Sequence, residues 1–359
     1  MLAVICRAFG PPETLVLEER PRPVPGCGEV LVEVHAAGVN FTDLLVIEGH
    51  SQLKRSPPLV PGVEAAGVVL EVGAGVTRVR PGQRVLGCKV QGTFAEEVLF
   101  QEDELAVLPE DMDMRSAAAF YVATMTVRYA LQERARLRAG EILLVLGAGG
   151  GAGLAGVEIG KALGARVVAA ASSEEKLALA KQRGADALVR YPRGPLDVPG
   201  QKALAAQLLA QAHRAGGPQS SLGKISSVHE AGYHVILDGV GGTYTEPALR
   251  ALGWQGRFLS IGFAAGVAKI SLGPALFKNA DICGIQPSAD EHRLPGRNPA
   301  ALATMFAWYR EGKVRPHIAH ELPLAGAARA LALLKERNAT GRIVLTTSRR
   351  ESTANVLCA

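Results

Sequence analysis

One short stretch limits the fold more than any other. Residues 144–156 read LVLGAGGGAGLAG, with six glycines after a run of apolar residues. The apolar run has the length of a buried strand, and the residues after the glycines have the pattern of a helix. A strand that turns through glycine directly into a helix is typical of sheets in which the helix N-terminus faces a phosphate group. We therefore predict a dinucleotide-binding turn, with a purely structural turn as the alternative.

Three registers of the glycine fingerprint fit this stretch, and the end of the strand decides among them. The strand ends at Leu146, so Gly147 opens the turn. Gly149 or Gly150 then lets the backbone approach the pyrophosphate, and a later glycine lets the helix pack close to the sheet. Gly156 lies inside the helix, where it serves packing. The predicted cofactor-binding glycines are Gly147, Gly149, Gly150, Gly151 and Gly153.

The residues on either side of the turn predict a doubly wound parallel sheet. Strand 141–147 is followed by helix 154–165, strand 166–171, helix 173–185 and strand 187–191. Strands from residues 233 and 256 would extend this sheet. Alternation of strand and helix is the pattern of an α/β fold. The segment 192–232 contains a helix, near 201–215, and then a polar loop rich in Gly and Ser.

The end of the second strand indicates which dinucleotide binds. Proteins that bind NAD carry an acid there, which accepts hydrogen bonds from the ribose 2′-hydroxyl. This strand ends at Ala171, followed by Ser172 and Ser173, and no acid is present. Lys176 and Tyr191 follow nearby, so we predict that Ser172, Lys176 and Tyr191 hold a 2′-phosphate and that the cofactor is NADPH. The alternative is that a serine caps the helix and Lys176 is a solvated surface residue.

Other parts of the chain predict a second, all-β domain. The 359 residues are long for one core. The first hundred residues alternate as short strands between Pro-Gly turns, and 342–347 again reads as a strand. The chain therefore leaves a partly barrel-like domain, builds the nucleotide domain and returns. The tail 348–359 has no partner pattern, and we expect it to be loosely ordered.

Composition excludes several classes of function. The net charge is +5, but the basic residues form no run and aromatics are only 5%, so we expect no nucleic-acid partner. No apolar stretch reaches the roughly 18 residues of a membrane helix. The first residues lack the pattern of a secretory signal, so a cytoplasmic location is expected. The five cysteines are scattered singly, which predicts neither a disulfide framework nor a metal cluster.

Several motifs in order resemble the medium-chain dehydrogenase/reductases. They read GVNFTDLL, PGVEAAGVVLEVGAGVTRVRPGQRV, GTFAEEV, LGAGGGAGLAGVEIGKALGA, SSEEKLALAKQRGA, LDGVGG and ATGRIVL. The sequence is most similar to the zinc-free quinone oxidoreductase branch, which includes zeta-crystallin-like proteins. The resemblance covers nearly the whole chain. It implies a GroES-like β-barrel domain over 1–121 and 268–359, a Rossmann domain over 122–267 with an enlarged loop in 192–232, a site between them, and a homodimer.

The resemblance also implies roles for single residues. Asn40 and Thr126 would flank the nicotinamide as catalytic residues. The alternative is that Asn40 is only a turn residue and Thr126 only a helix-packing residue. The backbone around Ile261, Gly262 and Phe263 would meet the nicotinamide ribose, and Lys278 and Asn279 would lie at the cofactor cleft. Asn40 and Val63 stand where zinc-containing relatives have metal ligands, and neither side chain suits zinc. Glu64 is also part of this motif and would lie near the site. A lone carboxylate at such a position is more often a structural anchor than a functional residue.

Without a metal ion, such an enzyme suits acceptors that are already activated by conjugation. We expect NADPH-dependent reduction of quinones or of α,β-unsaturated carbonyl compounds such as enones. One alternative is an enoyl-thioester reductase, which Lys54 and Arg55 would permit. Another is an NADPH-binding protein with little turnover. His50, Ser51 and Gln286 stand where relatives carry aromatic residues, and His50 is either a proton donor or a surface histidine without a role.

Overall fold

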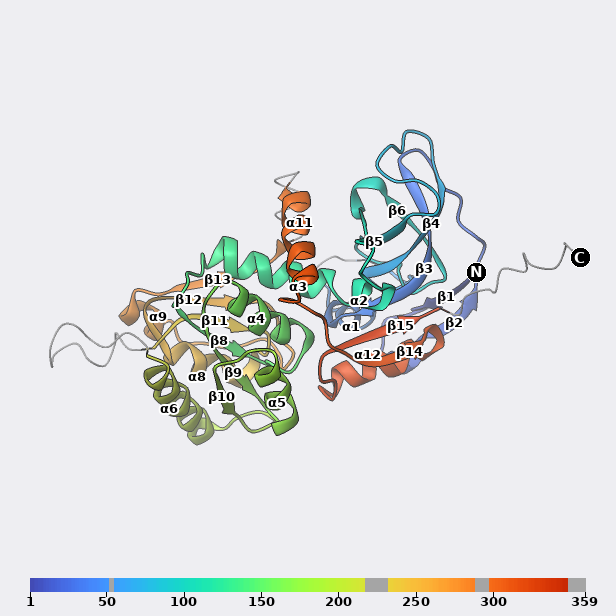
Figure 1. Cartoon of the computed structure of the whole chain (residues 1–359). Helices are drawn as coiled ribbons and strands as arrows, with labels where there is room; N and C mark the ends of the chain where they lie inside the picture. Colours follow the sequence, from blue (N-terminus) through green and yellow to red (C-terminus); the bar gives the residue numbers. More distant parts are fainter. Residues whose placement is uncertain (52–54, 217–231, 288–296, 348–359) are drawn as a thin grey trace, which may run out of the picture. The chain divides into compact units, whose positions relative to one another are not determined.

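The computed structural model describes residues 1–51, 55–216, 232–287 and 297–347 (Figure 1). Two compact units are present, one from Met1–Val122 and the chain from Ile318 on, the other from Ala123–His317. The chain thus leaves the first unit and returns to it, but the return comes at Ile318 and not at residue 268. The reason is that the intervening segment adds a strand and helices to the second unit. Each unit is described below by itself.

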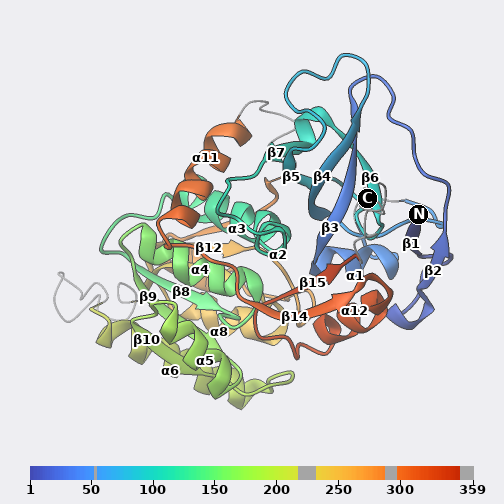
Figure 2. The same ribbon diagram turned by 45° about the vertical axis from the view of Figure 1, so that its right-hand side comes forward.

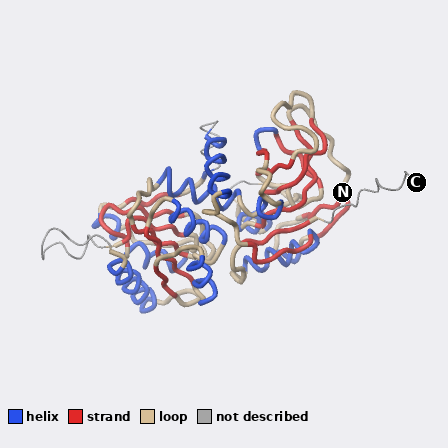
Figure 3. The backbone as a smooth tube through the Cα atoms, viewed as in Figure 1, coloured by secondary structure: helices blue, strands red, loops and turns tan. Residues whose placement is uncertain are grey.

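The first unit is built mainly of strands (Figure 3). Its elements are β1 (Leu2–Ile5), β2 (Val16–Glu19), β3 (Glu29–Val39), α1 (Phe41–Ile47), β4 (Glu64–Val72), β5 (Arg84–Cys88), β6 (Glu97–Gln101), β7 (Leu105–Val107), α2 (Met114–Ala118), β14 (Ile318–Pro323), α12 (Ala327–Lys335) and β15 (Arg342–Thr346). Short 3-10 turns occur at Pro12–Thr14, Glu102–Glu104 and Leu324–Gly326.

Strand β3 is the centre of the seven-stranded sheet in this unit. The strand order is β14-β15-β3-β4-β5-β7, and β6 also pairs with β3. β3 pairs with β4 along most of its length, and its other edge is shared by β6 at the start and β15 at the end. All these pairings are antiparallel. The last residues of β3 therefore lie between the first residues of β4 and of β15.

The second unit is a parallel sheet covered by helices. Its elements are α3 (Tyr121–Arg128, which begins at the end of the first unit), a π-helical turn (Tyr129–Arg134), β8 (Ile142–Leu146), α4 (Gly151–Ala162), β9 (Arg166–Ala171), α5 (Glu174–Gln182), β10 (Ala187–Arg190), α6 (Val198–Arg214), β11 (Tyr233–Asp238), a 3-10 turn (Gly242–Tyr244), α8 (Thr245–Arg250), β12 (Leu252–Ser260), α9 (Gly273–Lys278), β13 (Asp281–Gly284) and α11 (Arg297–Arg310).

The six strands of this unit have the order β10-β9-β8-β11-β12-β13, and all pairs are parallel. Side chains of α6 and α8 pack on one face of the sheet, in a core that includes Leu144, Val168 and Ile236. Helix α4 packs on the other face, because its Gly156 and Gly160 lie against Val145, Leu143 and Val167. Figure 2 shows α4 and α5 on the near side of β8 and β9. The sheet is thus covered on both faces, as a parallel sheet requires.

The doubly wound sheet predicted from the sequence is present, with one strand more than expected. The two predicted helices after the glycines and the predicted helix in 192–232 correspond to α4, α5 and α6. Strand β13 is the additional strand, and the sequence does not predict it because its four residues are too short for a periodic pattern. Most of the polar loop at the end of 192–232, together with the tail 348–359, lies outside the described residues.

Candidate functional site

Four parallel strands of the second unit end at the same edge of the sheet. Leu146 of β8 is opposite both Ala170 of β9 and Asp238 of β11, and Asp238 is opposite Ser260 of β12. The carboxyl edge of a parallel sheet, at the point where strand order reverses, is where such folds bind ligands. Here the order reverses between β8 and β11, so the loops after these strands form the candidate site.

The turn after β8 is shaped by its glycines. Gly147 has a φ of 72°, a left-handed conformation that only glycine adopts readily. A Cβ atom added to Gly153 would lie 2.1 Å from the carbonyl oxygen of Gly147, so the first turn of α4 packs directly on the turn before it. At Gly150, the residue before α4, an added Cβ would meet only that carbonyl oxygen, at 3.6 Å. The open space therefore lies beside Gly150.

Gly149 is covered by the side chain of Lys176. An added Cβ there would lie 2.4 Å from the Cβ of Lys176, so the aliphatic stem of Lys176 packs over Gly149. No side chain caps the N-terminus of α4. Its first backbone N–H groups and its dipole face the space beside Gly150, and these groups favour a phosphate. Of the two glycines that the sequence left open for approach to a pyrophosphate, the geometry favours Gly150.

The end of β9 has the residues expected for a phosphorylated ribose. Ser173 is the N-cap of α5, because its Oγ accepts a hydrogen bond of 3.3 Å from the backbone N–H of Lys176. The capping role is thus taken by Ser173, and Ser172 is not required for it. Tyr191 continues the ladder beside Ala171 through its backbone N–H, at 3.1 Å, and its ring is buried against that of Tyr244. Its side chain lies in the core that includes α6, which corrects the prediction that Tyr191 binds the 2′-phosphate.

The loops after β11 and β12 meet at the same edge. Asp238 is buried, and its Oδ1 accepts hydrogen bonds from the backbone N–H groups of Val240 and Gly241 at 2.8 and 3.0 Å. Its Oδ2 accepts one from the Thr245 hydroxyl at 2.6 Å. Burial raises the pKa of Asp238 against the lowering effect of these donors. The Ile261 backbone N–H donates to the Asp238 carbonyl, which brings the segment 261–263 to this edge.

Lys278 and Asn279 are not at this edge, which corrects the prediction for both. They end helix α9 and precede β13, so they lie at the amino edge of the parallel sheet. The Lys278 ammonium donates to the carbonyl oxygens of Arg250 and Leu252. Burial, with the nearby Arg250, lowers the pKa of Lys278 to about 8. Asn279 is the left-handed C-cap of α9, with a φ of 50°, whereas the Lys278 ammonium binds carbonyl oxygens at the end of α8 and the start of β12.

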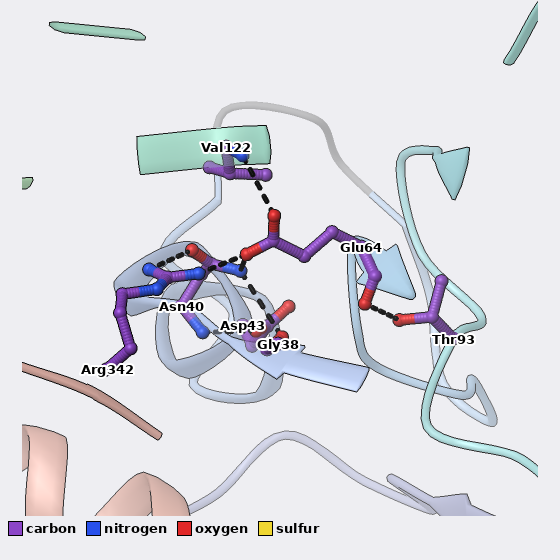
Figure 4. A network of polar contacts seen from close by, with 7 residues as sticks. All are labelled: Gly38, Asn40, Asp43, Glu64, Thr93, Val122 and Arg342. Carbon is purple, nitrogen blue, oxygen red and sulfur yellow. Dashed lines mark hydrogen bonds and ion pairs between the residues drawn. The ribbon is translucent and has the colours of Figure 1, made fainter. Parts of the chain in front are cut away.

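A second polar cluster is present in the first unit, at the ends of three neighbouring strands (Figure 4). Asn40 follows β3, Glu64 begins β4 and Arg342 begins β15. The Asn40 side-chain nitrogen donates to Glu64 Oε1 at 2.9 Å and to the Gly38 carbonyl at 3.3 Å. Arg342 donates to Asn40 Oδ1 at 2.9 Å and forms an ion pair with Glu64. All three side chains are buried.

Glu64 is the hub of this cluster. Its Oε2 accepts a hydrogen bond from the backbone N–H of Val122 at 2.8 Å, and its carbonyl oxygen accepts one from the Thr93 hydroxyl at 3.2 Å. Gly38 makes room for the Glu64 side chain, since an added Cβ would lie 2.5 Å from Glu64 Oε1 and 2.1 Å from the Ala118 carbonyl oxygen. A buried carboxylate requires such partners. Glu64 is therefore the structural anchor that the sequence suggested, with partners the sequence did not identify.

The predicted catalytic residues Asn40 and Thr126 belong to different units. Both hydrogens of the Asn40 carboxamide are used inside the cluster, and its Oδ1 accepts a hydrogen bond from Arg342. Thr126 lies on α3 and is half-buried. The sequence missed Arg342, because a single arginine before a strand gives no signal of a partner 302 residues away.

Two positions of the first unit are of interest as possible metal ligands. Val63 is apolar and the Asn40 carboxamide is bonded to its neighbours, so neither position offers a ligand. In the part of the chain that the structure describes, no three His, Cys, Asp or Glu side chains come together as a metal site. Within the same residues, no helix has the length and hydropathy to cross a membrane.

The remaining candidate positions lie at the surface. His50 is exposed, with its Nδ1 3.6 Å from Glu48 Oε2. Ser51 is half-buried, whereas Arg55 and Gln286 are exposed. Lys54 lies outside the described residues.

Comparisons with known proteins agree with this geometry. Residues 26–110 match the family model of the alcohol dehydrogenase GroES-like domain, and residues 219–345 match that of the zinc-binding dehydrogenases. The chain is 34% identical to quinone oxidoreductase-like protein 2 of Bos taurus, over 96% of this chain and 91% of that protein. It is 25% identical to the Escherichia coli quinone oxidoreductase solved with NADPH, with a TM-score of 0.83 over 96% and 100% of the two chains. A mycobacterial protein, also solved with NADPH, is 27% identical with a TM-score of 0.85 over 96% and 100%.

Proposed function

This chain belongs to the quinone oxidoreductase branch of the medium-chain dehydrogenase/reductases, and on that premise we propose that it reduces quinones or α,β-unsaturated carbonyl compounds with NADPH and without a metal ion. The observation that carries this proposal is the glycine turn before α4, where an uncapped helix N-terminus faces open space beside Gly150. Similarity to two proteins solved with NADPH supports the choice of cofactor.

The residues at the carboxyl edge of the sheet would hold the cofactor. The first N–H groups of α4 would bind the pyrophosphate, and Ser172 and Lys176 would bind the 2′-phosphate. The backbone of 261–263 would contact the nicotinamide ribose. Bound NADPH supplies a hydride, and the part of the protein is to orient the ring and to exclude water from the transfer.

The metal-free part of the proposal is supported by the residue types at two positions. Asn40 and Val63 replace the ligands that zinc-containing relatives have there, and Arg342 already occupies the Asn40 carbonyl oxygen. An acceptor for such a site must carry its own activation, as quinones and enones do by conjugation. We propose that Asn40 and Thr126 flank the nicotinamide.

Steady-state oxidation of NADPH with a panel of quinones, enals and crotonyl thioesters tests this function. We expect turnover with quinones or enals, a preference for NADPH over NADH, and full activity in protein that elemental analysis shows to be free of zinc. Turnover confined to the thioesters would instead identify an enoyl-thioester reductase. Tight binding of NADPH without turnover of any acceptor would identify a cofactor-binding protein. Equal use of NADH would contradict the cofactor proposed.

We also propose that the protein forms a homodimer through the free edge of the six-stranded sheet. Among the described residues, β13 is an edge strand, and large apolar side chains of the segment that precedes it are strongly exposed in the single chain. They include Val267, Leu272 and Leu276, with Leu276 77% exposed. An unpaired strand edge beside exposed apolar side chains is suited to pairing with another chain.

A further inference from the structure

Arg190 lies beside the position that decides between NADH and NADPH. In the parallel pair of β9 and β10, Arg190 is directly opposite Ala171. Ala171 is where an acid would stand in an NAD-binding protein. Val189 and Tyr191, on either side of Arg190, are buried in the core that includes α6. Because strand side chains alternate, Arg190 lies on the other face, where α5 begins.

The contact that Arg190 makes on this face is weak. Its Nη1 lies 3.2 Å from Glu174 Oε1, in the first turn of α5, next to the N-cap Ser173. Both side chains are largely exposed, 63% for Arg190 and 74% for Glu174. Exposed ion pairs of this kind contribute little free energy, so the guanidinium can exchange partners at small cost. A phosphate, with a charge of about −1.5 to −2, attracts it more strongly than one carboxylate.

We propose that Arg190 is a specificity-determining residue for the cofactor. When NADPH binds, Arg190 leaves Glu174 and binds the 2′-phosphate of the adenosine ribose. This inference rests on the proposed use of NADPH. It adds a second cation to Lys176, whose stem packs over Gly149. It also explains how the exposed acid Glu174 is tolerated near a phosphate, because Arg190 neutralises it in the free protein. Arg190 is in register with residue 171, so it would pair with an acid at that position. Such an acid would then be less available to accept hydrogen bonds from a ribose 2′-hydroxyl.

Isothermal titration calorimetry with NADPH, NADH, adenosine 2′,5′-bisphosphate and AMP tests this role. We expect Arg190→Gln to weaken the binding of NADPH and of the bisphosphate by about tenfold, as for loss of one hydrogen bond to a charged group. The affinities for NADH and AMP should change less than about twofold. The loss should shrink at high salt. Glu174→Gln should tighten NADPH, because it removes both the competing partner and a nearby negative charge.

Arg250→Gln is the matched control. Arg250 also forms an exposed ion pair with a glutamate, at 2.8 Å from Glu246, but at the amino edge of the same sheet. This variant should leave all four affinities unchanged.

The designed shift to NADH gives a second readout. We expect Ala171→Asp alone to increase NADH affinity only slightly, because Arg190 pairs with the new acid. The double variant Ala171→Asp with Arg190→Gln should increase NADH affinity by more than the sum of the two single effects. If the ratio of NADPH affinity to NADH affinity in Arg190→Gln equals that of the wild type, this inference is overturned and the proposed function stands. If the wild-type protein shows no preference, the proposed cofactor itself is contradicted.

Discussion

Asp43 is a fully buried carboxyl group beside a buried ion pair. Its Oδ2 accepts a hydrogen bond from the backbone N–H of Asn40 at 2.8 Å, while Oδ1 has no hydrogen-bond partner. Burial raises the pKa of Asp43 to about 8, and the charge of Glu64 acts in the same direction. Arg342 and the Asn40 N–H oppose the shift without cancelling it. Asp43 is therefore expected to be protonated in the folded protein at neutral pH.

This predicts that stability falls with rising pH. Because the folded pKa lies above the ordinary value of 3.8, the folded state holds the Asp43 proton across a window in which the unfolded chain has lost it. The stabilisation is complete below the unfolded value and is lost as the pH rises through about 8. The slope is at most about 1.4 kcal/mol per pH unit. Asp43→Asn should flatten the decline in thermal unfolding midpoint from pH 5 to 9.

Asp113→Asn is the control for that measurement. Asp113 caps α2 in the same unit, and hydrogen bonds from Ser116 and Arg115 hold the pKa of this carboxyl below its usual value despite partial desolvation. Its removal should affect stability at acid pH and leave the decline between pH 5 and about 8 in place. A decline over this range that is as steep in Asp43→Asn as in the wild type would show that another group causes it.

Single residues show where sequence interpretation reaches its limit. Ala171 ends a strand, and Gly147 and Ser172 each follow one, as the sequence indicates, because the apolar runs of these strands are easy to recognise. The position of Lys278 was implied by the resemblance alone, and no local pattern shows at which edge of the sheet it lies. Arg342 was missed because the partners of a buried arginine come from strands that are distant in sequence, and their register is set by the whole sheet.

At the scale of elements, helix α4 uses its glycines in two ways. Gly153, Gly156 and Gly160 form a face with little side-chain bulk, which lets the helix approach the turn and the strands beneath it. Gly150, one residue before the helix, faces open space, and its φ of −89° and ψ of 169° suit any residue. Packing and binding are therefore assigned to separate glycines of one motif.

Alanine substitutions should separate these two roles. Gly150→Ala fits the backbone and puts a methyl group where we expect the pyrophosphate, so it should weaken NADPH by about tenfold or more with little change in unfolding midpoint. Gly153→Ala places a methyl group against backbone atoms and should destabilise the fold by about 1–3 kcal/mol. Calorimetric titration and thermal unfolding of both variants measure the difference. The reverse pattern would show that Gly150 serves packing.

The elements themselves could be predicted where their periodicity was long. Strands β8 and β9 and helices α4, α5 and α6 follow from apolar runs and capping residues in the sequence. β13 did not, because its four residues are held by pairing with β12 and carry no pattern of their own. The return to the first unit, which the resemblance implies at residue 268, comes about fifty residues later, at Ile318.

At the scale of the whole molecule, the edge of the second unit predicts the oligomeric state. Leu276→Glu puts a charge among the exposed apolar side chains near β13. We expect sedimentation to give twice the 37.6 kDa chain mass for the wild type and a single chain mass for this variant. Leu188→Glu is the control, because Leu188 is an exposed residue on β10, the opposite edge of the same sheet. A wild-type protein that sediments as a single chain would contradict the dimer.

The pairing of β3 with β15 has a consequence for synthesis. On the ribosome, β3 emerges early, whereas β15 and Arg342 appear only after the entire second unit has been translated. Until then the Asn40 carboxamide and Glu64 lack their cation, and one edge of β3 lacks its neighbour. The nascent first unit must therefore wait for the C-terminal strand, while the second unit, continuous in sequence, can complete its own fold beforehand.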